Sequence, residues 1–287
     1  MSAWALLEGL DAETVIEVYF MMFSKGIQTF CFFLAVMSLL ISGCNDAVNS
    51  HADSKPVLAD SVSKRPAVAA KKVEAVRFDP VVKQIEGWTV NVDPQMLEGE
   101  YAGAGADALK MLANHLQRIA ILLPQKQLKE MRKLEIWIEH HHPKLGNMQY
   151  HPGARWLKNN GHDPRLVKQV HVTRCKNLLS RQQMIKHPAV ILHELAHSYH
   201  DQVLGFDDPR IIKAYKKAMV EKLYDKVLLY NGKRVRHYAA TDYKEYFAEG
   251  TEAYFYRNDF YPFVAAELKE HDPVLYDLMV EIWGPLR

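Results

Sequence analysis

Cysteine is scarce in this sequence. The chain of 287 residues contains three cysteines, and two of them, Cys31 and Cys44, lie within or directly after an apolar run near the N-terminus. The third, Cys175, lies in the part of the chain that we expect to fold. A disulfide framework needs an even set of cysteines in the folded part. We therefore expect no disulfide, and we expect Cys175 to be a small buried residue.

An excess of charge of one sign is also absent. The formal net charge is +2 at pH 7, which gives no electrostatic reason to expect a nucleic acid partner. Internal repeats and a series of long apolar runs are missing as well, which argues against fibrous and multi-span membrane proteins. The ordinary composition predicts a globular, monomeric protein with a buried core. Histidine, in contrast, is abundant, with fourteen residues, and metal chemistry is therefore worth examining.

One uncharged apolar run extends over residues 27–41, preceded by Lys25 and followed by two small residues and Cys44. This pattern is typical of a secretory signal, and the run is shorter than the roughly 20 residues that span a bilayer comfortably. Residues 40–44 also resemble a bacterial lipobox. The resemblance implies cleavage before Cys44, a lipid on its sulfur and an extracytoplasmic, membrane-anchored location in the bacterial cell envelope. The alternatives are a plain secretory signal, which would give a secreted protein, and an uncleaved membrane anchor.

The first twenty residues fit such a signal poorly, because a signal begins with basic residues and these are acidic. The acidic residues are Glu8, Asp11, Glu13 and Glu17. We hypothesise that translation starts at Met21 or Met22, and a precursor that begins at Met1 would refute this. Residues 45–72 lack apolar periodicity and indicate a flexible tether. The predicted organisation is an extension plus signal at 1–43, a tether at 44–72 and a folded domain at 73–287, without an inhibitory prodomain.

The folded part contains both strand and helix patterns. Alternating apolar residues predict strands at 87–92, 134–139 (half-buried) and 169–173. Apolar residues at helical spacing predict helices at 106–123, 188–204, 208–226, 242–256 and 272–283. A tight turn is predicted at Asn231–Gly232, and the spacing of Asp242 and Glu245 is that of a capping pair. This order predicts an α+β domain with a small mixed sheet and a mainly helical C-terminal part.

The sequence His193-Glu194-Leu195-Ala196-His197 carries the strongest chemical signal. On a helix, His193 and His197 lie one turn apart on one face, and two imidazoles there can bind one ion. Glu194 lies about 100° further round the helix. Zn²⁺ lowers the pKa of a water in its open position to about 7, and a carboxylate nearby can take the proton. The pattern therefore predicts a zinc-dependent hydrolase with one ion and with Glu194 as general base.

A catalytic zinc site needs a third protein ligand. Glu245, Glu249 and Glu252 share one face of the predicted helix at 242–256, beside several aromatic residues. A solvated helix face seldom has this composition. We expect one of these acids to bind the metal and another to orient a ligand histidine.

The two motifs together resemble those of the gluzincin metallopeptidases, and most closely the catalytic domain of the anthrax lethal factor type. The resemblance rests on H-E-L-A-H at 193–197 and E-Y-F-A-E at 245–249. It implies a zincin-like fold, Glu245 as the third zinc ligand, Glu249 in the shell behind the ligands and Tyr238 as the donor to the substrate carbonyl oxygen. The sequence departs from the family pattern at Ala196, where the family has glycine.

This resemblance implies a zinc metalloendopeptidase that acts on peptide or protein substrates. Two alternatives stay open, namely a catalytically inactive binding protein with a zincin fold and a zinc amidase that acts on cell-wall peptides. The predicted strand at 169–173 is a candidate edge for pairing with an extended substrate. We expect residues 258–263 to form a turn whose aromatic residues anchor the C-terminal helix, with a wall of the substrate groove as the alternative. We expect His140, His141 and His142 to form a solvated turn, and His200 to lie behind the site or at the surface.

Overall fold

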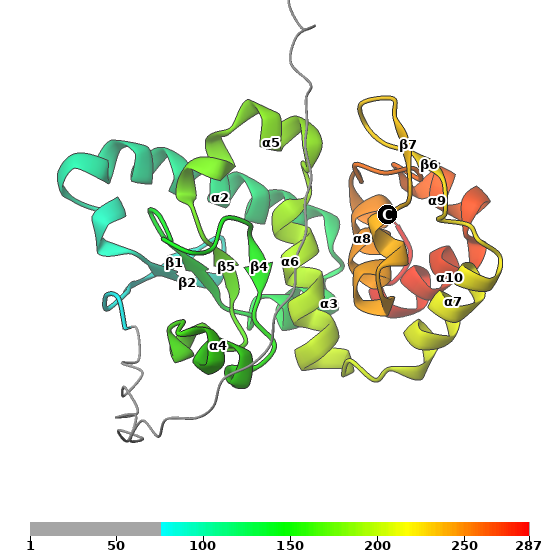
Figure 1. Ribbon diagram of the computed structural model, residues 1–287, viewed down its shortest axis with the longest axis horizontal. Coiled ribbons are helices and arrows are strands. Elements are labelled where there is room, and N and C mark those ends of the chain that lie inside the picture. The colour runs from blue at the N-terminus through cyan, green and yellow to red at the C-terminus, as the bar shows by residue number, and fades with distance from the viewer. Residues whose placement is uncertain (1–75, 287) are drawn as a thin grey trace, which may run out of the picture. The chain divides into compact units, whose positions relative to one another are not determined.

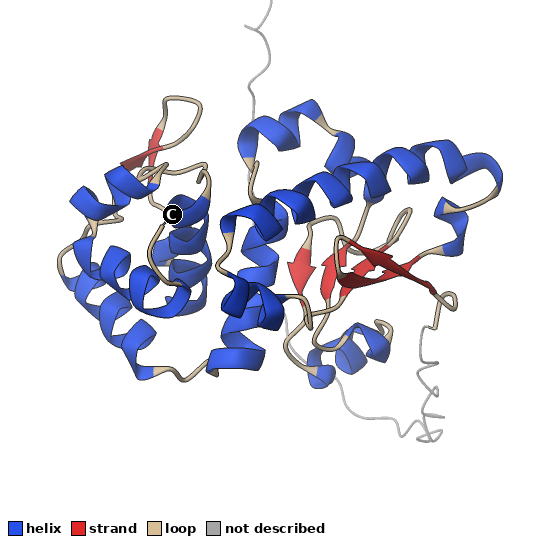
Figure 2. Ribbon diagram, turned by 180° about the vertical axis from the view of Figure 1, so that it is seen from behind, coloured by secondary structure: helices blue, strands red, loops and turns tan. Residues whose placement is uncertain are grey.

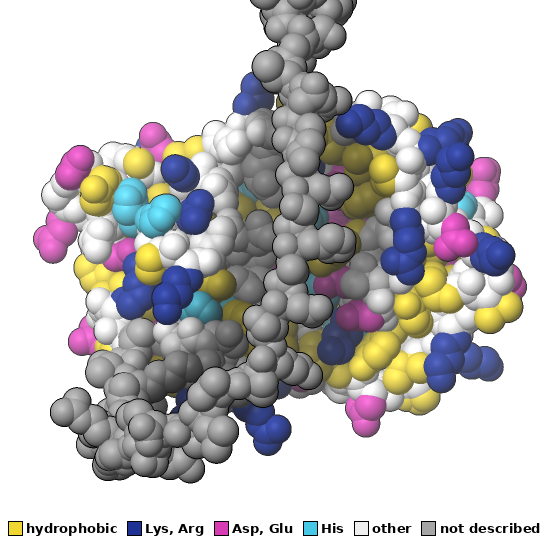
Figure 3. Space-filling model, viewed as in Figure 1, with side chains coloured by type: hydrophobic (Ala, Val, Ile, Leu, Met, Phe, Trp, Pro, Cys, Tyr) yellow, Lys and Arg dark blue, Asp and Glu magenta, His cyan; other side chains and the backbone are white. Residues whose placement is uncertain are grey.

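The computed structural model describes residues 76–286. The predicted signal, lipid-anchor and tether segments, with Cys31 and Cys44, lie outside these residues. Among the described residues, no helix combines the length and the apolar character that crossing a membrane requires. Figure 3 shows Lys and Arg side chains interspersed with Asp and Glu over the visible face, in keeping with the small net charge.

The described chain forms a mixed α+β structure, as predicted (Figure 1). Its strands are β1 (Val81–Ile85), β2 (Trp88–Val92), β3 (Ile136–Ile138), β4 (Gln149–Tyr150), β5 (Val170–Val172), β6 (Val227–Leu228) and β7 (Arg234–Val235). Its α-helices are α2 (Ala102–Leu122), α3 (Gln125–Met131), α4 (Ala154–Asn160), α5 (Arg181–Lys186), α6 (Val190–Tyr199), α7 (Pro209–Val220), α8 (Tyr243–Phe255), α9 (Ala265–His271) and α10 (Pro273–Trp283).

Five strands form one mixed sheet in the order β1-β2-β3-β5-β4. The three inner strands run parallel, with Val90 opposite Ile136 and Ile136 opposite Val170. Strands β1 and β4 pair antiparallel at the two edges. The small mixed sheet is therefore present as predicted, and the two edge strands are additions that the alternation pattern did not indicate.

Both faces of this sheet are covered. Side chains such as Ile136 and Val170 join the main core with α2 and α6, whereas Trp137 packs on the other face with Leu157 of α4. The expectation of a half-buried strand at 134–139 was wrong for this reason, because β3 is buried on both sides. The alternation there separates two buried faces rather than a core face from a solvent face.

Helix α6 runs between the sheet and the C-terminal helices (Figures 1 and 2). Nine of its ten residues are buried, and these include the polar His193, Glu194 and Ser198. It continues into a short π-helical turn, His200–Leu204. The predicted helix at 208–226 ends earlier, because α7 stops at Val220 and Lys222 adopts a positive φ of 57°.

The hairpin β6–β7 forms around Asn231–Gly232, as predicted. Gly232 has a φ of 86°, a backbone conformation that side chains other than glycine rarely adopt. Cys175 is buried and free, also as predicted.

Candidate metal centre

Helix α6 places His193 and His197 on the face that looks toward α8. Their Nε2 atoms lie 3.0 Å apart, as expected for two imidazoles one helical turn apart that converge on one point. His193 is 4% exposed, so the pair lies within the molecule at the base of a cavity.

Helix α8 brings Glu245 to the same point. Asp242 caps this helix, since its Oδ1 accepts hydrogen bonds from the backbone N–H groups of Lys244 and Glu245. The predicted capping pair is present only in part, because Asp242 caps the helix and Glu245 does not. The Glu245 carboxylate does not fold back on the cap but lies with Oε2 at 3.1 Å from His197 Nε2 and 3.2 Å from His193 Nε2. The cap thus fixes the backbone that carries this carboxylate.

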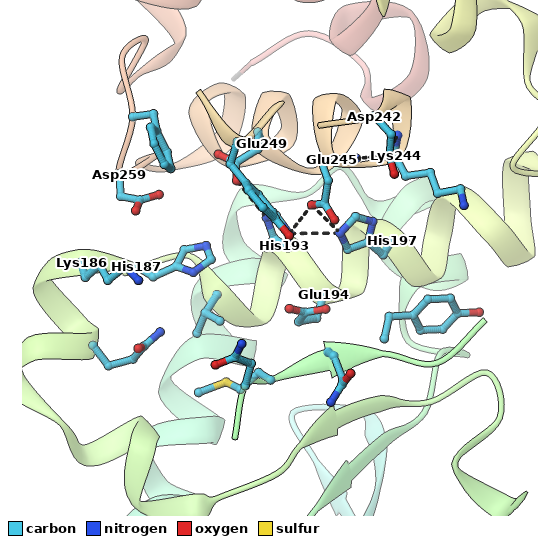
Figure 4. Close-up of a pocket in the computed structure, with 18 of the residues that line it drawn as sticks. Lys186, His187, His193, Glu194, His197, Asp242, Lys244, Glu245, Glu249 and Asp259 are labelled. Atoms are coloured by element: carbon cyan, nitrogen blue, oxygen red, sulfur yellow. Dashed lines mark hydrogen bonds and ion pairs between the residues drawn. The ribbon is translucent and has the colours of Figure 1, made fainter. Parts of the chain in front are cut away.

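The three donor atoms form a nearly equilateral triangle with sides of 3.0 to 3.2 Å, drawn in Figure 4. A tetrahedral zinc ion with ligands at about 2.0–2.1 Å places its donor atoms roughly 3.3 Å apart. The two imidazoles and the carboxylate are donors that zinc accepts. The structure therefore brings together three of the sequence-predicted residues in a set that fits one zinc ion.

Charge and burial oppose each other at Glu245. Burial by itself would raise the pKa of the carboxyl, but hydrogen bonds from His193 and His197 lower the pKa well below its ordinary value. The carboxylate is thus anionic at neutral pH, which is the form that binds a metal.

Glu194 lies beside this triangle, on the side toward β4 (Figure 4). It is 7% exposed and lines the cavity. No hydrogen bond engages its carboxylate among the described residues. A carboxylate in this place can accept a proton from a water held between it and the three donors.

The carboxylate that contacts His193 from behind is Glu252, not Glu249. Glu252 Oε1 lies 2.6 Å from His193 Nδ1, whereas Glu249 Oε1 lies 3.8 Å away. When Nδ1–H donates to Glu252, the Nε2 lone pair is left for a metal. Glu249 is buried nearby and accepts a hydrogen bond from Asn258 Nδ2 at 2.7 Å. The row of acids indicated this arrangement, but the spacing could not say which acid reaches the ring.

The pKa values of these two buried acids shift in opposite directions because their partners differ. Burial and repulsion by Glu252 raise the pKa of Glu249 to about 8. Burial would raise the pKa of Glu252 too, but the charges and hydrogen bonds of His187 and His193 lower it. The two pKa values thus shift in opposite directions: the surroundings of Glu252 favour its charged form, and those of Glu249 favour its neutral form.

We call the three donor atoms of His193, His197 and Glu245 the metal triangle. The cavity above it has a volume of about 650 Å³. Tyr238 lines it from the short 3-10 helix Tyr238–Ala240 and is 47% exposed. Burial, followed by the charge of Glu245, raises the pKa of Tyr238, so its hydroxyl is a proton donor at neutral pH. Asp259 and Phe260 form part of the wall, which agrees with the alternative interpretation of residues 258–263.

The edge of the sheet at this cavity is β4, not the strand predicted for that role. Strand β5 pairs with β3 on one side and with β4 on the other, so it has no free edge. Gln149 and Tyr150 of β4 line the cavity, and Met148 and Pro152 next to β4 do so as well. The two-residue strand was too short for its alternation to be recognised in the sequence.

The structure corrects two further expectations about histidine, namely the solvated turn at 140–142 and the surface as a place for His200. His141 is exposed, but His142 is 3% exposed and its Nδ1 accepts hydrogen bonds from the backbone N–H groups of Lys144 and Leu145. The three histidines are therefore not a solvated turn. His200 is fully buried against aromatic rings, and neither ring nitrogen has a hydrogen-bond partner in the described part of the chain.

His187 was not singled out by any motif. It stands before Pro188, lines the cavity and lies with Nε2 at 3.0 Å from Glu252 Oε1. A lone histidine between two helices gives no signal in a sequence, and only the packing of α6 against α8 reveals it.

Comparisons of the chain with family models, with curated proteins and with solved structures gave no match.

Proposed function

We propose that this chain is a zinc-dependent metallopeptidase with a zincin-like fold, similar to the gluzincins, that hydrolyses internal peptide bonds of peptide or protein substrates. The observation that supports it best is the triangle of His193, His197 and Glu245, with Glu194 beside it in an open cavity. The elements that carry these residues lie in the order that the gluzincin resemblance implies.

The residues of the site have separate roles in this proposal. His193, His197 and Glu245 would hold one zinc ion, which when bound supplies a Lewis acid that polarises the scissile carbonyl and acidifies water. Glu194 takes the proton of the attacking water and passes it to the leaving amine. Tyr238 donates its O–H to the oxygen of the former carbonyl as negative charge develops there.

An extended substrate would pair with β4. This edge strand is short and open to the cavity, and a peptide added to it would place its backbone across the metal triangle. Edge pairing binds backbone rather than side chains, so it suits a peptidase, whose substrates share that backbone.

Two measurements on the full chain test the proposal. We expect about one zinc per wild-type chain by metal analysis and loss of most of it in Glu245→Ala. We expect wild type to cleave members of a peptide library, and Glu194→Gln to keep its zinc while its turnover falls by about 10²–10⁴. Glu270→Gln, an exposed acid on α9, is the matched control and should behave like wild type.

Two results would contradict the proposal. Undiminished zinc in Glu245→Ala would reject the third ligand, and full cleavage by Glu194→Gln would reject the general base.

We also propose an extracytoplasmic, lipid-anchored location, which rests on residues 27–44 outside the described part. Labelling of cells with a radioactive fatty acid should mark the wild-type protein and not Cys44→Ser. An unlabelled wild-type protein would argue against the lipid anchor.

A further inference from the structure

His187 contacts the carboxylate behind the metal triangle. Its Nε2 lies 3.0 Å from Glu252 Oε1, and the same oxygen lies 2.6 Å from His193 Nδ1. One carboxylate oxygen therefore joins a candidate metal ligand to a histidine on another segment of the chain. Figure 4 shows His187 on the segment that leads into α6, on the side of His193 away from His197.

Glu252 depends on this contact more than an exposed carboxylate would. It is 0% exposed, and its second oxygen, Oε2, has no hydrogen-bond partner among the described residues. A buried carboxylate with few hydrogen bonds is costly and poorly fixed in orientation. Without His187, the His193 ring would be the one remaining hydrogen-bond partner of the Glu252 carboxylate among the described residues. The ring and the carboxylate could then rotate together.

His187 also has a side that faces the cavity. Its side chain is 20% exposed, and it lines the cavity near the metal triangle. The ring is thus fixed on one side by Glu252 and open on the other. Its backbone is held as well, since its N–H donates to Gln183 O at the end of α5.

We propose that His187 is a positioning residue for the metal centre: it holds Glu252 in the orientation that fixes the ring and tautomer of His193. The inference rests on the zinc site of the proposed function. Groups that hydrogen-bond to metal ligands, as Glu252 does to His193, commonly change metal affinity by 10–100-fold when they are removed, and loss of His187 should reproduce this effect to the extent that it releases Glu252.

A second ion is the competing explanation for this cluster. His187, His193 and Glu252 offer three donor atoms within 4.8 Å of one another. His193 would then bind metal through both ring nitrogens and lose the one N–H proton of its neutral imidazole, which becomes an imidazolate only with difficulty. The distance of 2.6 Å between His193 Nδ1 and Glu252 Oε1 is that of a strong hydrogen bond.

The test measures zinc affinity of the full chain by competition with a chelator. We expect about one zinc per chain, and we expect the zinc dissociation constant of His187→Ala to rise about 10–100-fold. His187→Gln keeps an N–H donor and should recover most of the affinity. The Co²⁺-substituted protein should show a changed visible spectrum in His187→Ala and a nearly native one in His187→Gln. His141→Ala, an exposed histidine elsewhere, is the control.

A double-mutant cycle with Glu252→Gln locates the effect. If His187 acts through Glu252, the two substitutions together should weaken zinc binding little more than either one alone. Additive effects would overturn the proposal. If His187→Ala does not fold, His187→Leu, which fills similar space without an N–H group, takes its place in the same comparison.

The remaining outcomes separate this inference from the proposed function. Wild type that binds no zinc would refute the proposed function. Wild type that binds one zinc, with affinity and cobalt spectrum unchanged in His187→Ala, would refute the inference alone. A rise in the KM of His187→Ala without a change in its zinc affinity would make His187 a substrate contact. Two zinc ions per wild-type chain would favour the second ion. Each of these two results would overturn the positioning role.

Discussion

Tyr238 is the candidate site residue with the most exposed side chain, at 47%, whereas His193 and Glu194 are 4% and 7% exposed. Its backbone is nonetheless fixed, because the preceding His237 is buried and its Nδ1 accepts a hydrogen bond from Ala239 N–H. Tyr238 can therefore present a hydroxyl to the cavity from a rigid support. This is the arrangement that an oxyanion donor needs.

Removal of this hydroxyl tests the role. We expect Tyr238→Phe to lower kcat about 10²–10³-fold, as for loss of one oxyanion donor, with zinc content and KM changed little. Steady-state kinetics on a cleaved library peptide measures the effect. Tyr230→Phe, in the neighbouring hairpin and outside the cavity lining, is the control, and equal kcat values for wild type and Tyr238→Phe would exclude the role.

The pKa values of the acids on α8 depend on the partners of each side chain. Glu249 and Glu252 lie on the same helix face, are both buried and differ in pKa direction. The difference follows from their partners, because two imidazoles approach Glu252 and an amide group approaches Glu249.

At the scale of elements, the proposed pairing with a substrate depends on β4. It pairs with β5 on one side and faces the cavity on the other. A bound strand would use every second backbone N–H and C=O for pairing, because antiparallel hydrogen bonds alternate along a strand.

Peptides with N-methylated backbone amides test this pairing. We expect methylation at alternate positions around the cleaved bond to lower kcat/KM about 10-fold, near the free energy of one hydrogen bond. Methylation at the positions between them should have a smaller effect. A series in which the position of the methyl group makes no difference would show that β4 does not bind substrate backbone.

Helix α2 offers a matched pair of glycines. A Cβ on Gly105 would lie 2.0 Å from the backbone oxygen of Met96, whereas a Cβ on Gly103 meets nothing within 4 Å. The close approach of α2 to the turn Pro94–Met96 therefore requires glycine at one of these positions and not at the other.

Alanine substitutions at these two positions should change the free energy of unfolding in opposite directions. Gly105→Ala should lower the free energy of unfolding by about 1–3 kcal/mol or more, as overpacking does. Gly103→Ala should raise it by up to about 1 kcal/mol, because alanine favours the helix and restricts the unfolded chain. Urea unfolding measures both, and equal stability of the two variants would contradict this packing.

For the whole molecule, buried neutral histidines link stability to pH. His171 is fully buried, with Nε2 at 3.1 Å from Glu139 Oε1 and Nδ1 at 3.0 Å from His151 Nε2. Burial, followed by the charges of neighbouring cations, lowers the pKa of His171 to about 3, and burial lowers the pKa of His151 to about 3 as well. The unfolded chain binds protons at these positions below about pH 6.5, and the folded chain does not.

The free energy of unfolding should therefore fall as the pH falls from about 6.5 toward 3. For His171 alone, acidification from pH 7 to 4.5 should cost roughly 3 kcal/mol. Urea unfolding across this range should give a shallower pH dependence for His171→Asn than for wild type. His141→Asn, which removes an exposed histidine, should keep most of the dependence, and parallel curves for His171→Asn and wild type would refute the argument.

The sequence predicted those features that depend on a local period. The helical repeat of 3.6 residues puts His193 above His197, and Glu245 on one face with Glu249 and Glu252. The structure agrees with these placements and with the hairpin at Asn231–Gly232. It differs where a segment is too short for its period to show, as in β4, or where both faces are buried, as in β3.

By itself, then, the sequence determined that His193 and His197 converge on one point and that three acids share one face of a later helix, because both spacings follow from the geometry of single helices; Glu245 as the third ligand came from the family resemblance. Only the tertiary structure decided that Glu252 rather than Glu249 reaches His193, that His187 joins them and that β4 is the free edge. These contacts join segments far apart in the chain. They depend on how α6 packs against α8 and against the sheet, and no period within one segment specifies that packing.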